Sequence, residues 1–389
     1  MPLTGKVRAS RRNGRGSTGL TALSPRYPVC GGLRPSSLVV VTKTNILLRA
    51  LSARSRRLLF RSSMRRSLRA LALVPLTLGS ACSSLPVVGR ATTERWAFSA
   101  PWDPRSAASV RAHGVALDGV VLDWIPLDTM TGMPFVLYTD SMSAEFPSSS
   151  RRMALVTSFV TDRFHPALIR RLAADSFALE RSAAAIAERV QRGGYRGIVL
   201  DFEGMTGADT ALTRTVVTTI ARTARTRGVG PVVIAIPASD TVGYPARLFA
   251  SSADLLLIML YDQHWATSPP GAIAEPLWVR RTLAMRVAES GAGRLVAGLP
   301  LYGYQWRANA PAATVSYDDA RRLVAEAGVA LERDPATTTL HAMRAGPDGW
   351  ELWVSDAMLL DALRREVTAL GVRRVAYWRL GLEDPALWR

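Results

Sequence analysis

Acidic residues are absent from the first 82 positions of the sequence, which hold 16 Lys and Arg residues. The whole chain of 389 residues carries 49 basic against 31 acidic residues, a formal net charge of +18. Removing those 16 from the total leaves 33 basic and 31 acidic residues in 83–389, so the body is nearly neutral. A neutral body lacks the electrostatic basis of nucleic-acid binding. We therefore expect no nucleic-acid partner.

Cysteine and histidine are also scarce, with two Cys and four His in the sequence. Two cysteines, Cys30 and Cys82, exclude a disulfide framework and a cysteine-rich zinc site. The His-Glu-x-x-His motif of zinc proteases is missing, and no nucleophilic Ser/His/Asp set emerges. We expect neither a metal ion nor a cofactor.

Residues 64–82 are typical of an export signal, with a basic start, a short apolar stretch and small residues before Cys82. The apolar stretch is too short to span a membrane, which takes about 20 residues. The ending Leu-Gly-Ser-Ala-Cys at 78–82 resembles a bacterial lipoprotein cleavage site, although Gly79 stands where that pattern prefers Leu. This ending predicts a lipidated Cys82 and a membrane-anchored protein that faces the periplasm or the cell exterior. An ordinary secretory cut near Ala81 is the alternative.

The signal begins at its own methionine, Met64, after a basic segment. We interpret residues 1–63 as a leader that is not translated or is disordered, and residues 83–94 as a tether. The remaining residues, 95–389, form the folded body, whose apolar content supports a sizeable core.

Apolar runs alternate with amphipathic stretches along the body. The predicted strands are 96–100, 119–124, 153–159, 197–202, 232–236, 255–260, 295–299 and 375–378. The predicted helices are 105–113, 165–174, 176–192, 209–227, 245–250, 275–290 and 356–370. This order predicts an α/β fold of the (β/α)₈ TIM-barrel type. A doubly wound sheet is the alternative, but the sequence offers no nucleotide-binding loop for it.

Two local patterns add detail to this prediction. In the helix 176–192, residues Phe177, Ala184, Ile186 and Val190 recur at helical spacing and define its apolar face. The stretch 308–355 breaks the alternation with a short helix and a hairpin around Gly-Pro-Asp-Gly, which predicts a small α+β insertion after strand seven.

In such a barrel, chemistry sits at the carboxyl ends of the strands. Val199, Asp201 and Glu203 point into the barrel, because strand residues alternate between faces. Two acids this close raise one pKa, so we expect Glu203 to hold a proton near neutral pH while Asp201 stays ionised. Two hydrogen-bonded structural acids are the alternative. Polar residues that close the other strands are Asp123, Trp124, Tyr261, Asp262, His264, Tyr302, Tyr304, Trp306 and Trp378.

Four stretches resemble motifs of glycoside hydrolase family 18, the chitinase-like family. The stretch 197–203, Gly-Ile-Val-Leu-Asp-Phe-Glu, resembles the strand-four motif Asp-Gly-x-Asp-x-Asp-x-Glu. The stretches 258–262 and 298–304 are similar to strands six and seven of the family, and Trp378 falls at its strand-eight tryptophan. The stretches around Tyr261 and Trp378 particularly resemble the spore-germination and peptidoglycan-hydrolase branch.

The resemblance implies a glycosidase that cleaves β-linked N-acetylhexosamine glycans, peptidoglycan or chitin-like, by a retaining, substrate-assisted mechanism. Glu203 is then the acid, Asp201 holds the substrate's acetamide group, and Tyr261 donates a hydrogen bond to that group. The predicted substrate-binding residues are Trp378, Asp262, Tyr302 and Trp124.

Arg196 and Val199 stand where the family has its first two motif aspartates. Val199 leaves Asp201 above an apolar neighbour, so burial should raise the pKa of Asp201. A catalytically silent glycan-binding lipoprotein on the same barrel is the alternative function. Loss of the proton-donating Glu would be its signature, and Glu203 is present.

Overall fold

The structure is a computed structural model that describes residues 93–138 and 151–389. The basic leader, the export signal with Cys82 and nearly all of the tether lie outside the described residues.

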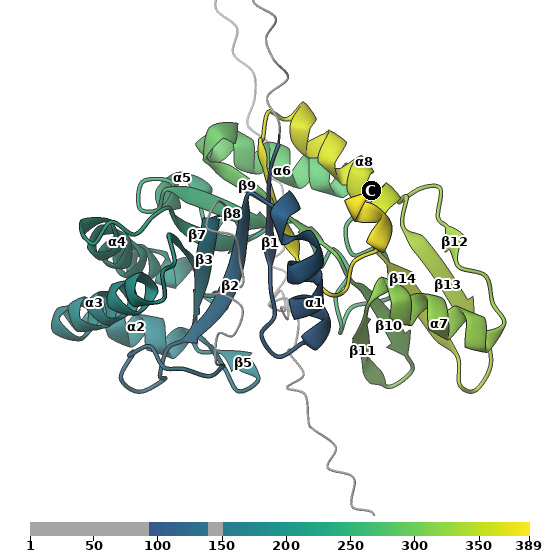
Figure 1. The fold of residues 1–389 in the computed structure, drawn as a ribbon, viewed down its shortest axis with the longest axis horizontal. Coiled ribbons are helices and arrows are strands. Elements are labelled where there is room, and N and C mark those ends of the chain that lie inside the picture. The colour runs from purple at the N-terminus through teal and green to yellow at the C-terminus, as the bar shows by residue number, and fades with distance from the viewer. Residues whose placement is uncertain (1–92, 139–150) are drawn as a thin grey trace, which may run out of the picture. The chain divides into compact units, whose positions relative to one another are not determined.

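Eight parallel strands close into a barrel in the order β1-β15-β9-β8-β7-β6-β3-β2 (Figure 1). The strands are β1 (Glu94–Phe98), β2 (Gly119–Pro126), β3 (Arg151–Thr157), β6 (Gly197–Asp201), β7 (Val232–Pro237), β8 (Leu255–Met259), β9 (Leu295–Pro300) and β15 (Arg374–Trp378). The predicted TIM barrel is confirmed, and each predicted strand end lies within two residues of the observed one. Between β3 and β6 lies a small hairpin of β4 (Phe159–Val160) and β5 (Arg163–Phe164).

Helices cover the outside of the barrel, as the amphipathic stretches predicted. They are α1 (Pro104–His113), α2 (Pro166–Ala174), α3 (Ser176–Arg192), α4 (Thr210–Thr226), α5 (Ala246–Phe249), α6 (Pro276–Ser290) and α8 (Ala357–Ala369). Short 3₁₀ turns are η1 (Gly114–Ala116), η2 (Gly207–Asp209), η3 (Ala292–Arg294) and η4 (Pro385–Trp388). Several helices begin where an aspartate side chain accepts a backbone N–H of the first turn, as Asp103, Asp175 and Asp356 do.

The apolar face of α3 differs from the predicted one at Phe177 and at Ala184, which is only partly buried. Phe177 is 71% exposed, because it lies in the first turn on the side away from the barrel. The buried face is formed by Leu179, Ala183, Ile186 and Val190.

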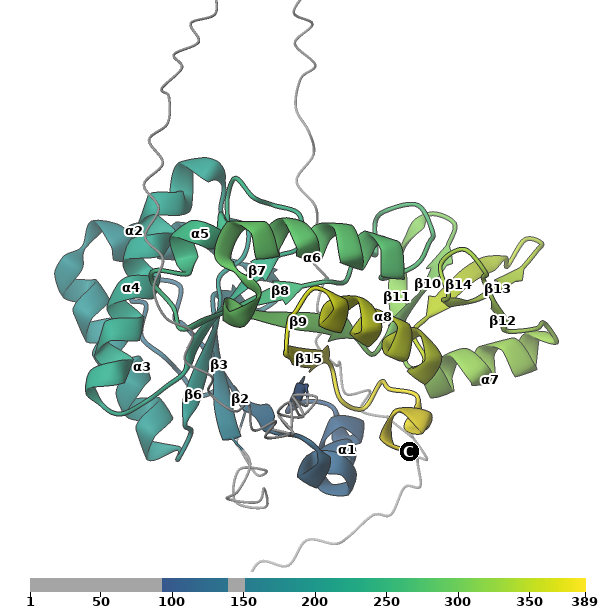
Figure 2. The ribbon, with the colours of Figure 1, turned by 90° about the horizontal axis from the view of Figure 1, so that it is seen from above.

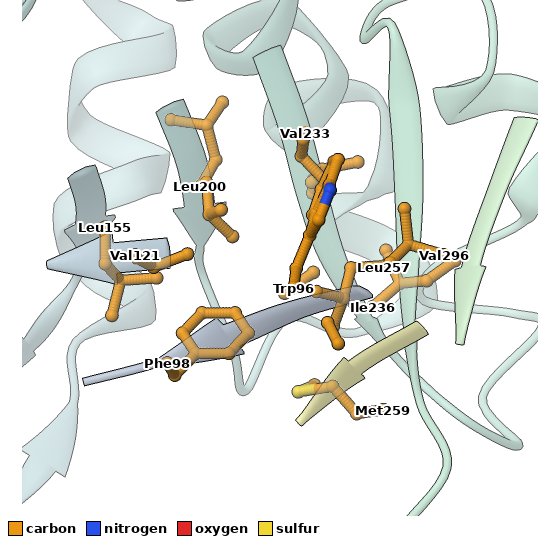
Figure 3. Close-up of a cluster of buried hydrophobic side chains, with 14 of the residues drawn as sticks. Trp96, Phe98, Val121, Leu155, Leu200, Val233, Ile236, Leu257, Met259 and Val296 are labelled. Atoms are coloured by element: carbon orange, nitrogen blue, oxygen red, sulfur yellow. The ribbon is translucent and has the colours of Figure 1, made fainter. Parts of the chain in front are cut away.

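The barrel interior is filled by large apolar side chains from many strands. Trp96 and Phe98 of β1 extend among Val121, Leu155, Val233, Leu257 and Val296, which come from five other strands (Figure 3). Each such buried side chain contributes about 1.5–3 kcal/mol to the free energy of folding. The barrel is therefore a packed core, and a site can form only at the open ends of its strands.

The insertion after β9 is an antiparallel sheet in the order β11-β10-β14-β13-β12, with one helix against it. Its elements are β10 (Gly303–Arg307), β11 (Ala310–Val315), α7 (Tyr317–Ala327), β12 (Glu332–Arg333), β13 (Leu340–Arg344) and β14 (Trp350–Val354). The sheet begins at Gly303, five residues before the predicted start at 308, because the chain enters β10 almost directly from β9. It has its own apolar core, formed by residues such as Val324 and Leu352, separate from the barrel core.

Candidate active site

Asp201 and Glu203 lie together at the carboxyl end of β6. We call the carboxyl ends of the eight barrel strands the barrel mouth. They are 7% and 8% exposed, and their carboxyl groups are hydrogen-bonded to each other. Strand β3 lies next to β6 (Figure 2). The two strands are parallel, and their register pairs Thr157 with Asp201. The hydroxyl of Thr157 donates a hydrogen bond to Oδ2 of Asp201 over 3.3 Å.

Burial raises the pKa of Asp201 from 3.8 to about 7, although the hydrogen bonds from Thr157 and Glu203 oppose this rise. Below Asp201, Val199 is fully buried and offers no polar contact. The direction of this rise agrees with the one expected from the apolar floor of Asp201, and the assignment of the shared proton to Glu203 stays a prediction. Two close acids in a site with little water hold one proton between them near neutral pH, as proton transfer to a substrate requires.

Gly204 follows Glu203 and turns the chain away from the barrel with a φ of +76°, which favours glycine. A Cβ atom at this position would also lie 3.1 Å from Pro166 at the start of α2. This turn fixes where the carboxyl group of Glu203 points.

Aromatic rings surround the acids at the mouth. The ring of Trp378 is half-buried and lies nearly parallel to that of Tyr261, with centroids 6.2 Å apart. The edge of Phe98 packs on Trp378 from below at 5.2 Å. The peptide bond between Trp378 and Arg379 is cis. Trp378 and Tyr261 offer the apolar surface on which a sugar ring stacks in carbohydrate sites.

Asp262 is held by two phenol groups, one from the link between β9 and β10 and one from β10. The hydroxyls of Tyr302 and Tyr304 both donate hydrogen bonds to its Oδ1. Its other oxygen, Oδ2, is buried without a hydrogen-bond partner, and burial raises the pKa of Asp262 to about 7. Its φ of +57° turns the side chain out of the alternation of β8, which explains why the sequence did not decide its direction.

The two remaining predicted substrate-binding residues lie behind this surface. Trp124 is 3% exposed, and its indole N–H donates to the carbonyl of Ser99 over 2.9 Å. Its ring packs against Trp102 at 4.7 Å and Trp378 at 5.7 Å. Tyr302 is 1% exposed beneath Asp262. Both side chains therefore support the residues that face the mouth.

One strand-end acid turns away from the mouth. The register between β2 and β3 shifts between Val121 and Asp123, so Asp123 points outward. Its Oδ2 accepts a hydrogen bond from Arg189 of α3 over 2.9 Å. Asp123 is thus part of the contact between sheet and helix.

The loop after β8 leads from Asp262 toward the insertion. His264 and Trp265 form their hydrogen bonds within this loop, to Pro269 and Thr267. Trp306 of β10 donates to the carbonyl of Ser268, and a hollow of about 440 Å³ lies between this loop and the tips of β10 and β14. The insertion is therefore bonded to the same loop that carries Asp262.

No helix in 93–138 or 151–389 has the length and apolar character needed to cross a membrane. Within the same ranges, no three His, Cys, Asp or Glu side chains are grouped closely enough to hold a metal ion.

Comparison with known proteins gives relatives but no family model that matches. The chain is 30% identical over 163 residues to a Bacillus subtilis (strain 168) protein provisionally named sporulation-specific glycosylase YdhD, covering 40% of this chain and 38% of that protein. It is 24% identical over 254 residues to the cortical fragment-lytic enzyme of the same organism, covering 61% of this chain and 58% of that enzyme. The chain thus spans less than two thirds of the length of these curated relatives.

Among solved structures, a class V chitinase from Pseudomonas fluorescens Pf-5 superposes with a TM-score of 0.68 at 22% identity. The alignment covers 76% of this chain and 98% of that chitinase, so the two share their fold. These findings agree with the resemblance read from the sequence: the chain is similar to a sporulation-specific glycosylase and to a cortical fragment-lytic enzyme, and it has the fold of a class V chitinase.

Proposed function

We propose that the protein is an exported glycosidase that cleaves β-linked N-acetylhexosamine glycans of peptidoglycan or chitin-like polymers. The observation that carries this proposal is the hydrogen-bonded pair of Asp201 and Glu203, buried at the mouth to which β15 also brings Trp378. A proton held between two acids at a mouth that also carries aromatic rings suits the cleavage of a glycosidic bond.

In the proposed mechanism the substrate supplies its own nucleophile. The acetamide oxygen attacks the anomeric carbon while Glu203 gives its proton to the leaving oxygen, so the glycosidic bond breaks and an oxazolinium ring forms. Glu203 then takes a proton from water, and the water oxygen attacks the anomeric carbon and reopens the ring. The configuration is retained because the anomeric carbon is attacked twice.

The neighbours of Glu203 have distinct parts in this mechanism. Asp201 accepts the acetamide N–H and stabilises the developing positive charge. Tyr261 donates to the acetamide oxygen, and Trp378 supports the distorted sugar ring from below. Asp262, which accepts hydrogen bonds from Tyr302 and Tyr304 through Oδ1, holds the wall of the site next to Tyr261.

Peptidoglycan is the polymer that we favour. The support is the name of one relative, a cortical fragment-lytic enzyme, and the expected export through the signal that ends at Cys82. A lipid on Cys82 would keep the enzyme at the membrane beside the wall glycan.

The test is to incubate the purified protein with peptidoglycan and with chitin oligomers and to identify the products by mass. We expect Glu203→Gln to lower the rate by about 10²–10⁴-fold and to leave glycan binding intact, because the acid is lost without a change of shape. Glu332→Gln, in the exposed β12, serves as the matched control.

Unchanged hydrolysis in Glu203→Gln would exclude this mechanism. Binding of glycans without turnover by the wild type would instead favour the silent glycan-binding protein.

A further inference from the structure

The backbone on both sides of Glu203 is bonded to one side chain from another part of the chain. The hydroxyl of Tyr244 donates to the carbonyl of Phe202 over 2.7 Å and accepts from the backbone N–H of Met205 over 3.1 Å. Tyr244 is buried, and it comes from the loop after β7. A single hydroxyl therefore closes the turn that presents Glu203.

The loop that carries Tyr244 packs tightly against this turn. A Cβ atom on Gly243 would lie 3.0 Å from the carbonyl oxygen of Met205 and 2.5 Å from Oδ2 of Asp240, so this close approach favours glycine. From the other side, the hydroxyl of Thr210 lies 3.1 Å from the carbonyls of Val242 and Gly243. The loop and the turn thus form one packed unit.

A fully buried arginine holds this loop from beneath. Arg286 of α6 is 0% exposed, and its guanidinium donates to four carbonyls of the loop over 2.7–3.0 Å, those of Pro237, Ala238, Asp240 and Tyr244. The remaining contact is an ion pair with Glu289 at 3.1 Å. Burying a guanidinium destabilises the fold unless its N–H groups are hydrogen-bonded. Here the planar group is bonded to four backbone carbonyls, which holds the loop in one conformation.

Tyr244 remains a hydrogen-bond donor across the working pH range. Burial raises the pKa of its hydroxyl, and the nearby charges of Glu203 and Asp201 raise it further. The link from Arg286 through Tyr244 to the turn therefore does not change with the protonation of the two acids.

We propose that Tyr244, held in place by Arg286, is a positioning residue for Glu203. It touches neither substrate nor reacting atoms, and it keeps the acid at the distance from Asp201 and from the leaving oxygen that proton transfer needs. This inference rests on the proposed function, since it assigns Glu203 as the acid.

The experiment compares Tyr244→Phe with Tyr195→Phe. Each removes one buried phenol hydroxyl, but the hydroxyl of Tyr195, just before β6, has no hydrogen-bond partner. We expect Tyr244→Phe to lower kcat by about 10- to 100-fold with KM within about twofold, because a small displacement of the acid slows chemistry without weakening binding. Tyr195→Phe should behave as the wild type.

Amide hydrogen exchange at Met205 provides a readout that does not depend on activity. In Tyr244→Phe the Met205 N–H loses its acceptor and should exchange faster, and in Tyr195→Phe it should not. In an Arg286→Lys background, Tyr244→Phe should lower kcat by a smaller factor than it does alone. Both changes loosen the same connection, which runs from Arg286 through Tyr244 to the turn after Glu203.

Equal kcat in the two Phe variants, or a loss confined to KM, would overturn the proposal. So would slow exchange at Met205 in Tyr244→Phe, whatever the activity. Failure of the proposed function looks different: the wild type would turn over neither glycan, while the exchange at Met205 would still differ between the two variants.

Discussion

The carboxyl group of Asp262 accepts hydrogen bonds from phenol hydroxyls, whereas most buried carboxylates form ion pairs with cationic side chains. Tyr302 and Tyr304 satisfy Oδ1, but no positive side chain contacts the group among the described residues. Burial therefore outweighs the hydrogen bonds and raises its pKa to about 7. In the free protein, its ionisation near neutral pH costs stability.

Replacing the carboxyl group of Asp262 tests how much its ionisation lowers the free energy of unfolding. Because the folded pKa of Asp262 lies above its ordinary value of 3.8, its contribution to stability is full below about pH 4 and is lost as the pH rises to about 7. Asp262→Asn cannot ionise, so its stability relative to the wild type should rise over this window by up to about 4 kcal/mol. Chemical denaturation at pH 4, 5.5 and 7.5 measures this difference. Asp348→Asn, in the exposed turn after β13, should give no such trend, and a flat difference for Asp262→Asn would contradict the prediction.

At the scale of elements, the insertion behaves as a small unit attached to the mouth. Its core residues are separate from those of the barrel, yet Tyr304 and Trp306 bond it to the loop that carries Asp262. The insertion is therefore joined to one side of the mouth, and under the proposed function we expect it to add contacts with a long glycan.

Leu352→Ala is expected to loosen this wall and leave the barrel intact. A Leu→Ala change in a core costs about 2–5 kcal/mol, here confined to the core of the insertion. Hydrolysis of long glycans should then fall more than hydrolysis of short oligomers. Leu363→Ala, in the barrel core on α8, is the control and should affect both substrates alike. Equal losses in Leu352→Ala would give the insertion a purely stabilising role.

The elements themselves could be predicted because their signals are local. Period-two and helical patterns, with glycines and prolines between them, locate all eight strands of the barrel and the helix Tyr317–Ala327. Pairing between strands is not local, so the sequence did not indicate that Thr157 lies opposite Asp201 or that a register shift turns Asp123 outward. Tyr244 was missed for the same reason, since its partners lie about 40 residues away in the chain.

At the scale of the whole molecule, we propose that the protein is held at a membrane through Cys82. Mass spectrometry of the N-terminus from membrane fractions should find an acylated Cys82 as the first residue. Cys82→Ser should release the protein from the membrane, because the thiol that carries the lipid is lost. A soluble product that starts at Ser83 would contradict the lipid anchor and leave export intact.

The point where the chain enters the barrel gives this anchor a direction. Glu94 begins β1 at the end opposite the mouth, where Arg151 and Arg374 hold its carboxylate over 2.7 and 3.0 Å. The tether from Cys82 therefore joins the barrel at the end opposite the mouth. Residues 83–93 reach at most about 40 Å when fully extended. If Cys82 is lipidated, the barrel is attached at the end away from the mouth, so the anchor leaves the strand ends with Asp201 and Glu203 open to a glycan within reach of the tether.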